Sequence, residues 1–157
     1  MISLLDKLLI EAENEGIEII EHAFTSNKLK GLYVDGVITL NTIAINSYIE
    51  KTCVLAEEMG HHLTSFGNIL DQKCIVKRKQ EKRARNWAYY KLVPLEAFIY
   101  AFETGVRNRY EFADTVGVTE EFLDFSIARY KEKFGLFTEL NETYTIYFDP
   151  LGVLKAI

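Results

Sequence analysis

The sequence has few of the features that mark secreted, membrane-spanning or nucleic-acid-binding proteins. Its 157 residues include only two cysteines, Cys53 and Cys74, and no CxxC pair, which excludes a disulfide framework and a four-cysteine zinc site. No apolar run approaches the roughly 18 residues of a membrane span, and Met1–Asp6 does not resemble a signal peptide. The net charge is -5, which opposes a nucleic-acid-binding surface. We therefore expect a cytoplasmic protein with reduced thiols, and neither a membrane nor a nucleic acid as its partner.

The apolar content is sufficient for one folded domain. Hydrophobic residues make up 48% of the chain, and the chain holds nine tyrosines and ten phenylalanines, which predict a core built from large rings. No repeat or linker interrupts the sequence. We expect a single domain over residues 1–157, with a helix, a sheet and a site-bearing helix in residues 1–76 and a mostly helical part with a terminal strand in residues 77–157.

The first part of the chain predicts a helix, a small sheet and a second helix. Apolar residues recur at helical spacing over 2–15, and residues 17–22 read as a strand. Residues 32–40 predict a hairpin, because Asp35-Gly36 between two β-branched or aromatic runs favours a type I′ turn. We expect these three strands to form a small antiparallel sheet, followed by a helix that begins near Ile45.

The second part predicts mainly helices. After a loop over 65–76 come helices over 77–92, 95–104, 109–116 and 119–134, then a strand over 143–148. The two helices after Arg109 have the outline of a DNA-reading helix-turn-helix unit. However, the second of them opens with Glu120, Glu121 and Asp124, whose charge opposes contact with phosphates. The fold class is therefore α+β, and we do not expect this unit to read DNA.

The stretch Cys53–His62 concentrates most of the residues suited to chemistry. It contains an E-E-x-x-H pattern, in which Glu57 and His61 stand at i and i+4 and so share one helix face. Zinc peptidases use that spacing in H-E-x-x-H, with two metal ligands and a glutamate base between them. By this comparison Glu57 and His61 are candidate metal ligands and Glu58 is the candidate base. The alternative is an ordinary exposed helix whose last turn holds a histidine favoured by the helix dipole.

Small residues in two helices predict where a third ligand comes from. Ala56 and Gly60 would let another helix approach closely, and Glu81 shares one side of its own helix with Ala84 and Ala88. Glu81 is therefore the candidate third ligand, and Asp71 and His62 are the alternatives. A site with two carboxylates and one imidazole would hold zinc, although less selectively than a two-histidine site, so manganese and iron stay open.

Taken together, these blocks resemble the ImmA/IrrE family of metallo-endopeptidases found in phages and mobile elements. The resemblance is carried by Cys53–His62, by Glu81–Ala88 with the following Leu92-Val93-Pro94, and by residues 109–113 and 117–122. It implies a zincin-like α+β core and a zinc peptidase that cleaves a helix-turn-helix repressor. It also implies Glu58 as the base, and Glu57, His61 and Glu81 as the ligands. The sequence departs from the family pattern at Glu57, where relatives have histidine, and at Arg83, where many have glutamate.

Two hypotheses follow. The first is an intracellular metal-dependent endopeptidase that acts on a regulatory protein, whose peptide would add as a strand to the edge of the sheet containing Val37–Leu40. The second is a catalytically silent relative that binds a repressor or another partner through the same cleft. The charged run over 77–85 is interpreted simply as the solvated face of a helix.

Overall fold

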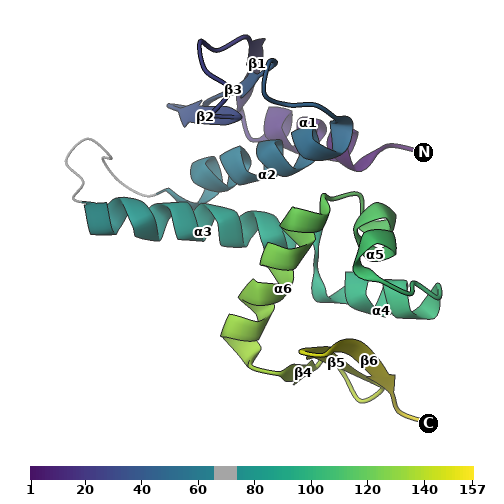
Figure 1. Cartoon of the computed structure of the whole chain (residues 1–157). Coiled ribbons are helices and arrows are strands. Elements are labelled where there is room, and N and C mark those ends of the chain that lie inside the picture. The colour runs from purple at the N-terminus through teal and green to yellow at the C-terminus, as the bar shows by residue number, and fades with distance from the viewer. Residues whose placement is uncertain (66–73) are drawn as a thin grey trace. The chain divides into compact units, whose positions relative to one another are not determined.

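The computed structural model describes residues 1–65 and 74–157, which form two compact units (Figure 1). The first unit is Met1–Ala88 and the second is Tyr89–Ile157. The boundary between them falls inside the helix α3 (Cys74–Leu92). The single domain expected over the whole chain stays a prediction.

The first unit opens with α1 (Leu4–Asn14), which confirms the expected first helix. Ser3 caps it, because the Ser3 side chain accepts from the Asp6 backbone while the Asp6 carboxylate accepts from the Ser3 backbone. Leu5, Leu8 and Ala12 form its buried face. The capped start and this apolar stripe are sufficient to fix the helix against the core.

The first sheet contains β1 (Glu18–His22), β2 (Gly31–Val34) and β3 (Val37–Asn41), in the order β1-β3-β2. The hairpin is confirmed: β2 and β3 pair antiparallel, and Asp35 and Gly36 have φ values of 47° and 81°, as a type I′ turn requires. The fully antiparallel sheet was wrong, because β1 and β3 run parallel. The connection between β1 and β2 crosses the sheet and leaves a space between these two strands, and β3 then occupies that space.

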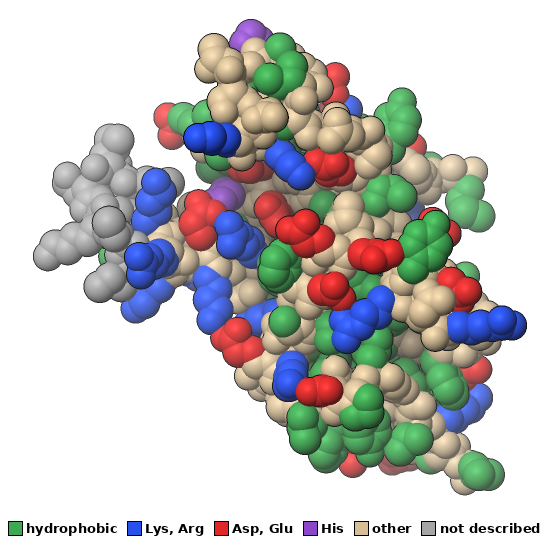
Figure 2. Space-filling view, in the orientation of Figure 1, with side chains coloured by type: hydrophobic (Ala, Val, Ile, Leu, Met, Phe, Trp, Pro, Cys, Tyr) green, Lys and Arg blue, Asp and Glu red, His purple; other side chains and the backbone are tan. Residues whose placement is uncertain are grey.

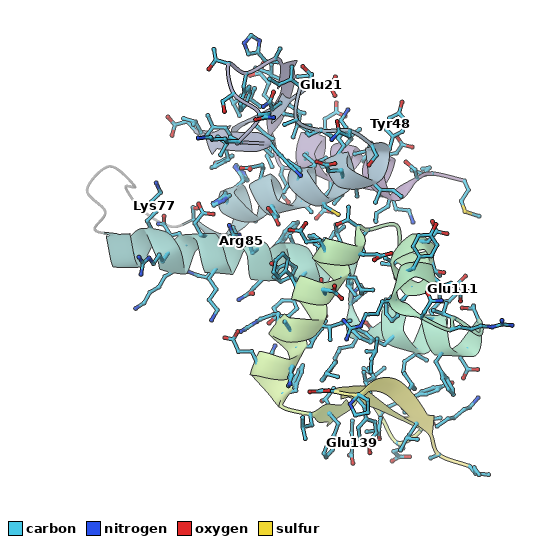
Figure 3. All side chains as sticks on the ribbon, in the orientation of Figure 1. Glu21, Tyr48, Lys77, Arg85, Glu111 and Glu139 are labelled. Atoms are coloured by element: carbon cyan, nitrogen blue, oxygen red, sulfur yellow. The ribbon has the colours of Figure 1, made fainter. Side chains whose placement is uncertain are left out.

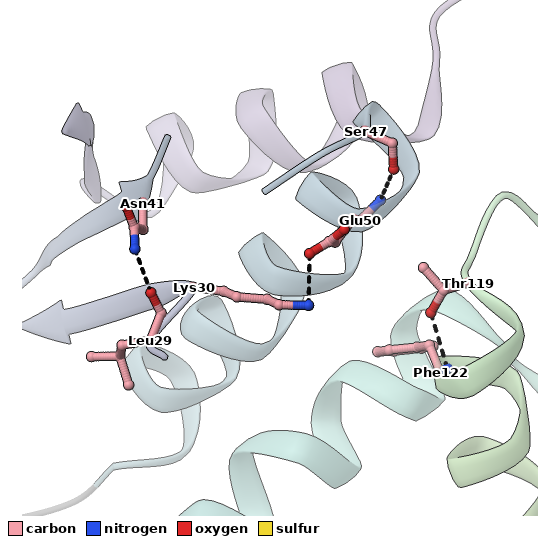
Figure 4. Close-up of polar contacts among 7 residues, drawn as sticks. All are labelled: Leu29, Lys30, Asn41, Ser47, Glu50, Thr119 and Phe122. Carbon is pink, nitrogen blue, oxygen red and sulfur yellow. Dashed lines mark hydrogen bonds and ion pairs between the residues drawn. The ribbon is translucent and has the colours of Figure 1, made fainter. Parts of the chain in front are cut away.

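Asn41 holds that connection in place. It is completely buried, and its side-chain amide donates to the carbonyl oxygens of Ser26 and Leu29, the latter drawn in Figure 4. Its side-chain oxygen accepts from the backbone of Phe24 and Ile43. One buried side chain thereby satisfies four backbone groups around the loop, which fixes how the chain enters β2.

The site-bearing helix is α2 (Tyr48–Thr64), capped by Ser47, whose side chain accepts from the Glu50 backbone (Figure 4). It packs against α1, β2 and β3. Thr52, Leu55 and Met59 lie on its buried face, whereas Tyr48 is 79% exposed at the start of the helix (Figure 3). Cys74 is the first residue of α3, so the loop predicted over 65–76 is too long by three residues.

The second unit contains the end of α3, three further helices and a second sheet. The helices are α4 (Leu95–Glu103), α5 (Arg109–Val116) and α6 (Glu120–Phe134), close to their predicted bounds, and Thr119 caps α6 by accepting from the Phe122 backbone (Figure 4). The antiparallel sheet has the order β4 (Phe137–Glu139), β5 (Tyr144–Phe148) and β6 (Leu151–Lys155). Only β5 was predicted.

Large rings fill the core of the second unit, as the composition predicted. Phe98 makes edge contacts with Phe112, Tyr130 and Phe148, and Tyr130 stacks on Phe148. The buried hydroxyl of Tyr130 donates to the Val93 carbonyl oxygen at 2.8 Å. Burial is the main reason that the pKa of Tyr130 lies well above its ordinary value. Within residues 1–65 and 74–157, no helix is long and apolar enough to cross a membrane.

Candidate functional site

The site is built where α3 approaches α2 within the first unit. A methyl group added to Gly60 would lie 2.3 Å from the Ala84 carbonyl oxygen, so only glycine permits this separation of the two backbones. Ala56, Ala84 and Ala88 are completely buried. The close packing predicted from small residues is therefore present, and it brings the next turn of α3 beside the end of α2.

That approach places His61 and Glu81 side by side. The His61 Nε2 atom lies 3.5 Å from Glu81 Oε2, and the two side chains are 20% and 42% exposed. The structure thus brings together two of the predicted site residues from separate helices, at a distance that allows an ion pair or a shared cation. Both remain accessible to solvent, as residues that meet a substrate must be.

Glu58 lies beside this pair and is half-buried. Burial is the main cause that raises its pKa to about 7, and the negative charges of Glu57 and Glu81 raise it further. The strand β2 lies against Glu58. A methyl group on Gly31 would lie 3.0 Å from both Cγ and Oε1 of Glu58. The absence of a side chain at Gly31 therefore leaves the room that the Glu58 carboxylate occupies.

His62 is engaged elsewhere. Its Nδ1 atom lies 2.8 Å from the hydroxyl of Tyr33 on β2, and the two rings meet edge to face with centroids 5.5 Å apart. The Tyr33 hydroxyl also accepts from the Gly36 backbone at 3.1 Å, so it joins His62 to the turn of the hairpin. This arrangement gives His62 a role in joining α2 to the hairpin, while Asp71, the other alternative, lies outside the described residues.

Sequence reasoning missed Tyr33 and Gly31. Neither belongs to a metal-site pattern, and their importance depends on which face of β2 meets α2. Alternation along the hairpin was the available signal, because Gly31 and Tyr33 stand two residues apart and so share one face of the strand. That signal gains meaning only when the partner helix is known.

The sheet that contains Val37–Leu40 has its edges at β1 and β2. The strand Val37–Asn41 is central, with β1 on one side and β2 on the other. Among the described residues, β2 is paired only with β3, so its other edge is unpaired, and the face of β2 at Gly31 lies against Glu58. A peptide that extended the sheet next to the site would pair with Gly31–Val34 rather than with Val37–Leu40.

The residues present suit a divalent cation by charge, although they are not arranged around one. Within the described part of the chain, no three His, Cys, Asp or Glu side chains are grouped so as to hold a metal ion. Nevertheless, Glu57, Glu58 and Glu81 place negative charge beside one imidazole, and the charges of Glu57 and Glu81 add to burial in raising the pKa of Glu58. A cation would relieve that repulsion, and carboxylate and imidazole are ordinary zinc ligands.

Comparison with known proteins identifies the family of the chain. No curated protein matches the chain. A family model does match, over residues 12–128, and that range contains every residue of the site described above. The model is Peptidase_M78, the IrrE N-terminal-like domain, and it spans most of the chain. This protein therefore belongs to the IrrE N-terminal-like metallopeptidase family, whose members are implied to use a metal cofactor.

Proposed function

We propose that this chain is a metal-dependent endopeptidase that uses zinc, with Glu57, His61 and Glu81 as ligands and Glu58 as general base. The observation that carries the proposal is the 3.5 Å approach of His61 Nε2 to Glu81 Oε2 beside the half-buried Glu58 carboxylate. Two helices supply these groups, and the family to which the chain belongs is one of metallopeptidases.

Each side chain has a separate part in the proposed reaction. A bound zinc ion would supply Lewis-acid activation of a peptide carbonyl and of water. Glu58 takes a proton from the attacking water and returns it to the leaving amine. A general base works best when its pKa lies near the working pH, and the pKa of about 7 suits that requirement. Gly31 keeps β2 close to Glu58, so a peptide that paired with β2 would extend the sheet that lies against the carboxylate.

The proposed substrate is a protein, and specifically a helix-turn-helix transcriptional repressor, as the resemblance to ImmA/IrrE proteins implies. Cleavage of a repressor inside the cell would release the genes that it silences. A protein substrate is the natural expectation for a peptidase family.

A catalytically silent relative that binds the repressor is the second candidate. It is favoured by Glu57 at the position of a family histidine, and by the lack of a three-residue metal group among the described residues. A silent binder would use the same surface without chemistry at Glu58.

Glu58→Gln separates the two candidates, because it keeps the size of the side chain and removes the proton acceptor. In a peptidase, cleavage of the cognate repressor should fall by roughly 100- to 10,000-fold while repressor binding persists. Derepression in cells should be lost as well. If derepression survives Glu58→Gln unchanged, the peptidase proposal fails and the binding role replaces it.

A further inference from the structure

The charged run on α3 forms one ordered surface beside the candidate site. Lys77, Glu81 and Arg85 are spaced by four residues and so lie along one stripe of the helix, with Arg78 and Lys82 on the adjoining stripe. These five residues line a surface hollow of about 500 Å³. Figure 2 shows lysine and arginine side chains gathered over α3, and Figure 3 labels Lys77 and Arg85 on that helix. We call Lys77, Arg78, Lys82 and Arg85 the basic stripe.

Three cations of the basic stripe make no hydrogen bond or ion pair that would stabilise the described part of the fold. Among the described residues, Lys77, Arg78 and Arg85 have no hydrogen-bond or ion-pair partner, and all three are exposed. Unpartnered cations gathered in a hollow of a chain whose net charge is -5 are available to an anionic ligand. Glu81, which approaches His61, lies in the middle of the hollow, so whatever binds there also reaches the candidate site.

We propose that the basic stripe binds acidic side chains of the protein substrate on both sides of the bond to be cleaved. This inference rests on the proposed peptidase function. Four residues of helix rise by about 6 Å, so Lys77 and Arg85 stand about 6 Å before and after Glu81 along the helix. An extended peptide advances about 3.3 Å per residue, so 6 Å corresponds to about two residues. The substrate would therefore carry Asp or Glu about two positions from the cleavage point on each side.

The pattern of charge favours a peptide over a nucleic acid. Glu81 interrupts the basic stripe at its centre, and Glu57 and Glu58 lie near Glu81. A nucleic-acid strand carries a charge at every phosphate and would meet this anionic centre unfavourably. A peptide can place a neutral residue over Glu81 and acidic residues over Lys77 and Arg85.

The test is the affinity of a designed peptide for matched charge variants. The probe is fluorescein-labelled Gly-Ala-Glu-Ala-Ala-Ala-Glu-Ala-Gly, whose glutamates are four residues apart, and its binding is measured by fluorescence anisotropy at low ionic strength. K77Q/R85Q removes two charges from the basic stripe. K79Q/R83Q removes two charges from exposed positions on the other side of the same helix and is the control.

K77Q/R85Q should weaken binding by about fivefold or more, whereas K79Q/R83Q should change it by less than about twofold, because exposed charge pairs each contribute modestly. Replacement of both probe glutamates by glutamine should weaken binding to the unmodified protein to a similar extent. Equal losses in the two double variants would overturn the inference, as would equal binding of the glutamine peptide. Tighter binding of a short oligodeoxythymidylate than of the acidic peptide would also overturn it, in favour of a nucleic-acid ligand.

The same titrations in an E58Q background keep this inference separate from the proposed function. Binding that follows the charge of the basic stripe, together with no repressor cleavage by the unmodified chain, would overturn only the proposed function. Conversely, an active peptidase whose peptide affinity is the same in K77Q/R85Q and K79Q/R83Q would overturn only the role of the basic stripe.

Discussion

Gly60 and Ala84 set the distance between the two helices that carry the candidate site. A methyl group on Gly60 would lie 2.3 Å from the Ala84 carbonyl oxygen and 2.9 Å from the Ala84 carbonyl carbon. These are backbone atoms, which cannot turn aside as a side chain can. The pairing of His61 with Glu81 therefore depends on a glycine that takes no part in the chemistry itself.

The first prediction concerns that glycine. Gly60→Ala should destabilise the protein by about 1–3 kcal/mol, since overpacking forces α2 and α3 apart despite the better helix propensity of alanine. It should also weaken metal binding, because Glu81 moves away from His61. Urea unfolding and a zinc titration measure the two effects. Gly152→Ala is the control, since a methyl group there would meet nothing within 4 Å. Unchanged stability in Gly60→Ala would contradict the packing described here.

The second prediction concerns Gly31, the residue of β2 that lies against Glu58. A methyl group on Gly31 would lie 2.9 Å from Cγ1 of Val54 and 3.0 Å from the Glu58 side chain. The long Glu58 side chain can turn aside more easily than the β-branched Val54, so Gly31→Ala should fold while displacing the carboxylate. Misplacement of a catalytic group by about 1 Å can reduce the rate about 100-fold. Repressor cleavage should therefore fall by roughly 10- to 100-fold while the thermal unfolding midpoint changes little. Full activity in this variant would show that the position of Glu58 is not critical.

The third prediction is a pH dependence of stability in the metal-free protein. The pKa of Glu58 is raised from 4.5 to about 7 by burial first and by Glu57 and Glu81 second, so between these values the folded state binds more protons than the unfolded state. The free energy of unfolding should therefore decrease as pH rises from about 4.5 to 7, by about 3 kcal/mol at most. Glu58→Gln should remove this slope. Parallel pH profiles for the two proteins, measured by urea unfolding, would contradict the assignment.

The fourth prediction concerns the link between β2 and α2. Tyr33→Phe removes the hydroxyl that joins His62 Nδ1 to the Gly36 backbone, which should destabilise the protein by about 0.5–1.5 kcal/mol. If His62 serves this link, His62→Phe should lose a similar amount, and the double variant should lose less than the sum of the two. A double-mutant cycle measured by urea unfolding tests this coupling. Strict additivity would show that the two side chains act independently.

Local patterns in the sequence were sufficient for most of the helices and for the hairpin. The Asp35-Gly36 turn and the cap at Thr119 each act over a few residues, so their effects can be predicted from the sequence. Two short strands, β4 and β6, were not predicted. They are stabilised by pairing with β5 rather than by their own residues, and such pairing is not visible in a short segment.

The candidate site also combines features that local spacing predicts with features that depend on long-range packing. The spacing of Glu57, Glu58 and His61 follows from the helix alone, and the alanines of α3 indicated that Glu81 would approach them. The parallel pairing of β1 with β3, the pairing of His62 with Tyr33 and the proximity of Gly31 to Glu58 depend on how strands and helices meet. These are long-range relationships, and no pattern of neighbouring residues specifies them.

Zinc binding by matched histidine variants tests the central claim most directly. Metal-free protein should bind one zinc ion per chain in a calorimetric titration. His61→Ala and Glu81→Ala should weaken that binding at least about tenfold, because each removes a proposed ligand. His62→Ala, which alters the adjacent histidine paired with Tyr33, should leave the stoichiometry at one and the affinity nearly unchanged. Zinc binding that is lost in His62→Ala but retained in His61→Ala, or no zinc binding by the unmodified chain, would contradict the account.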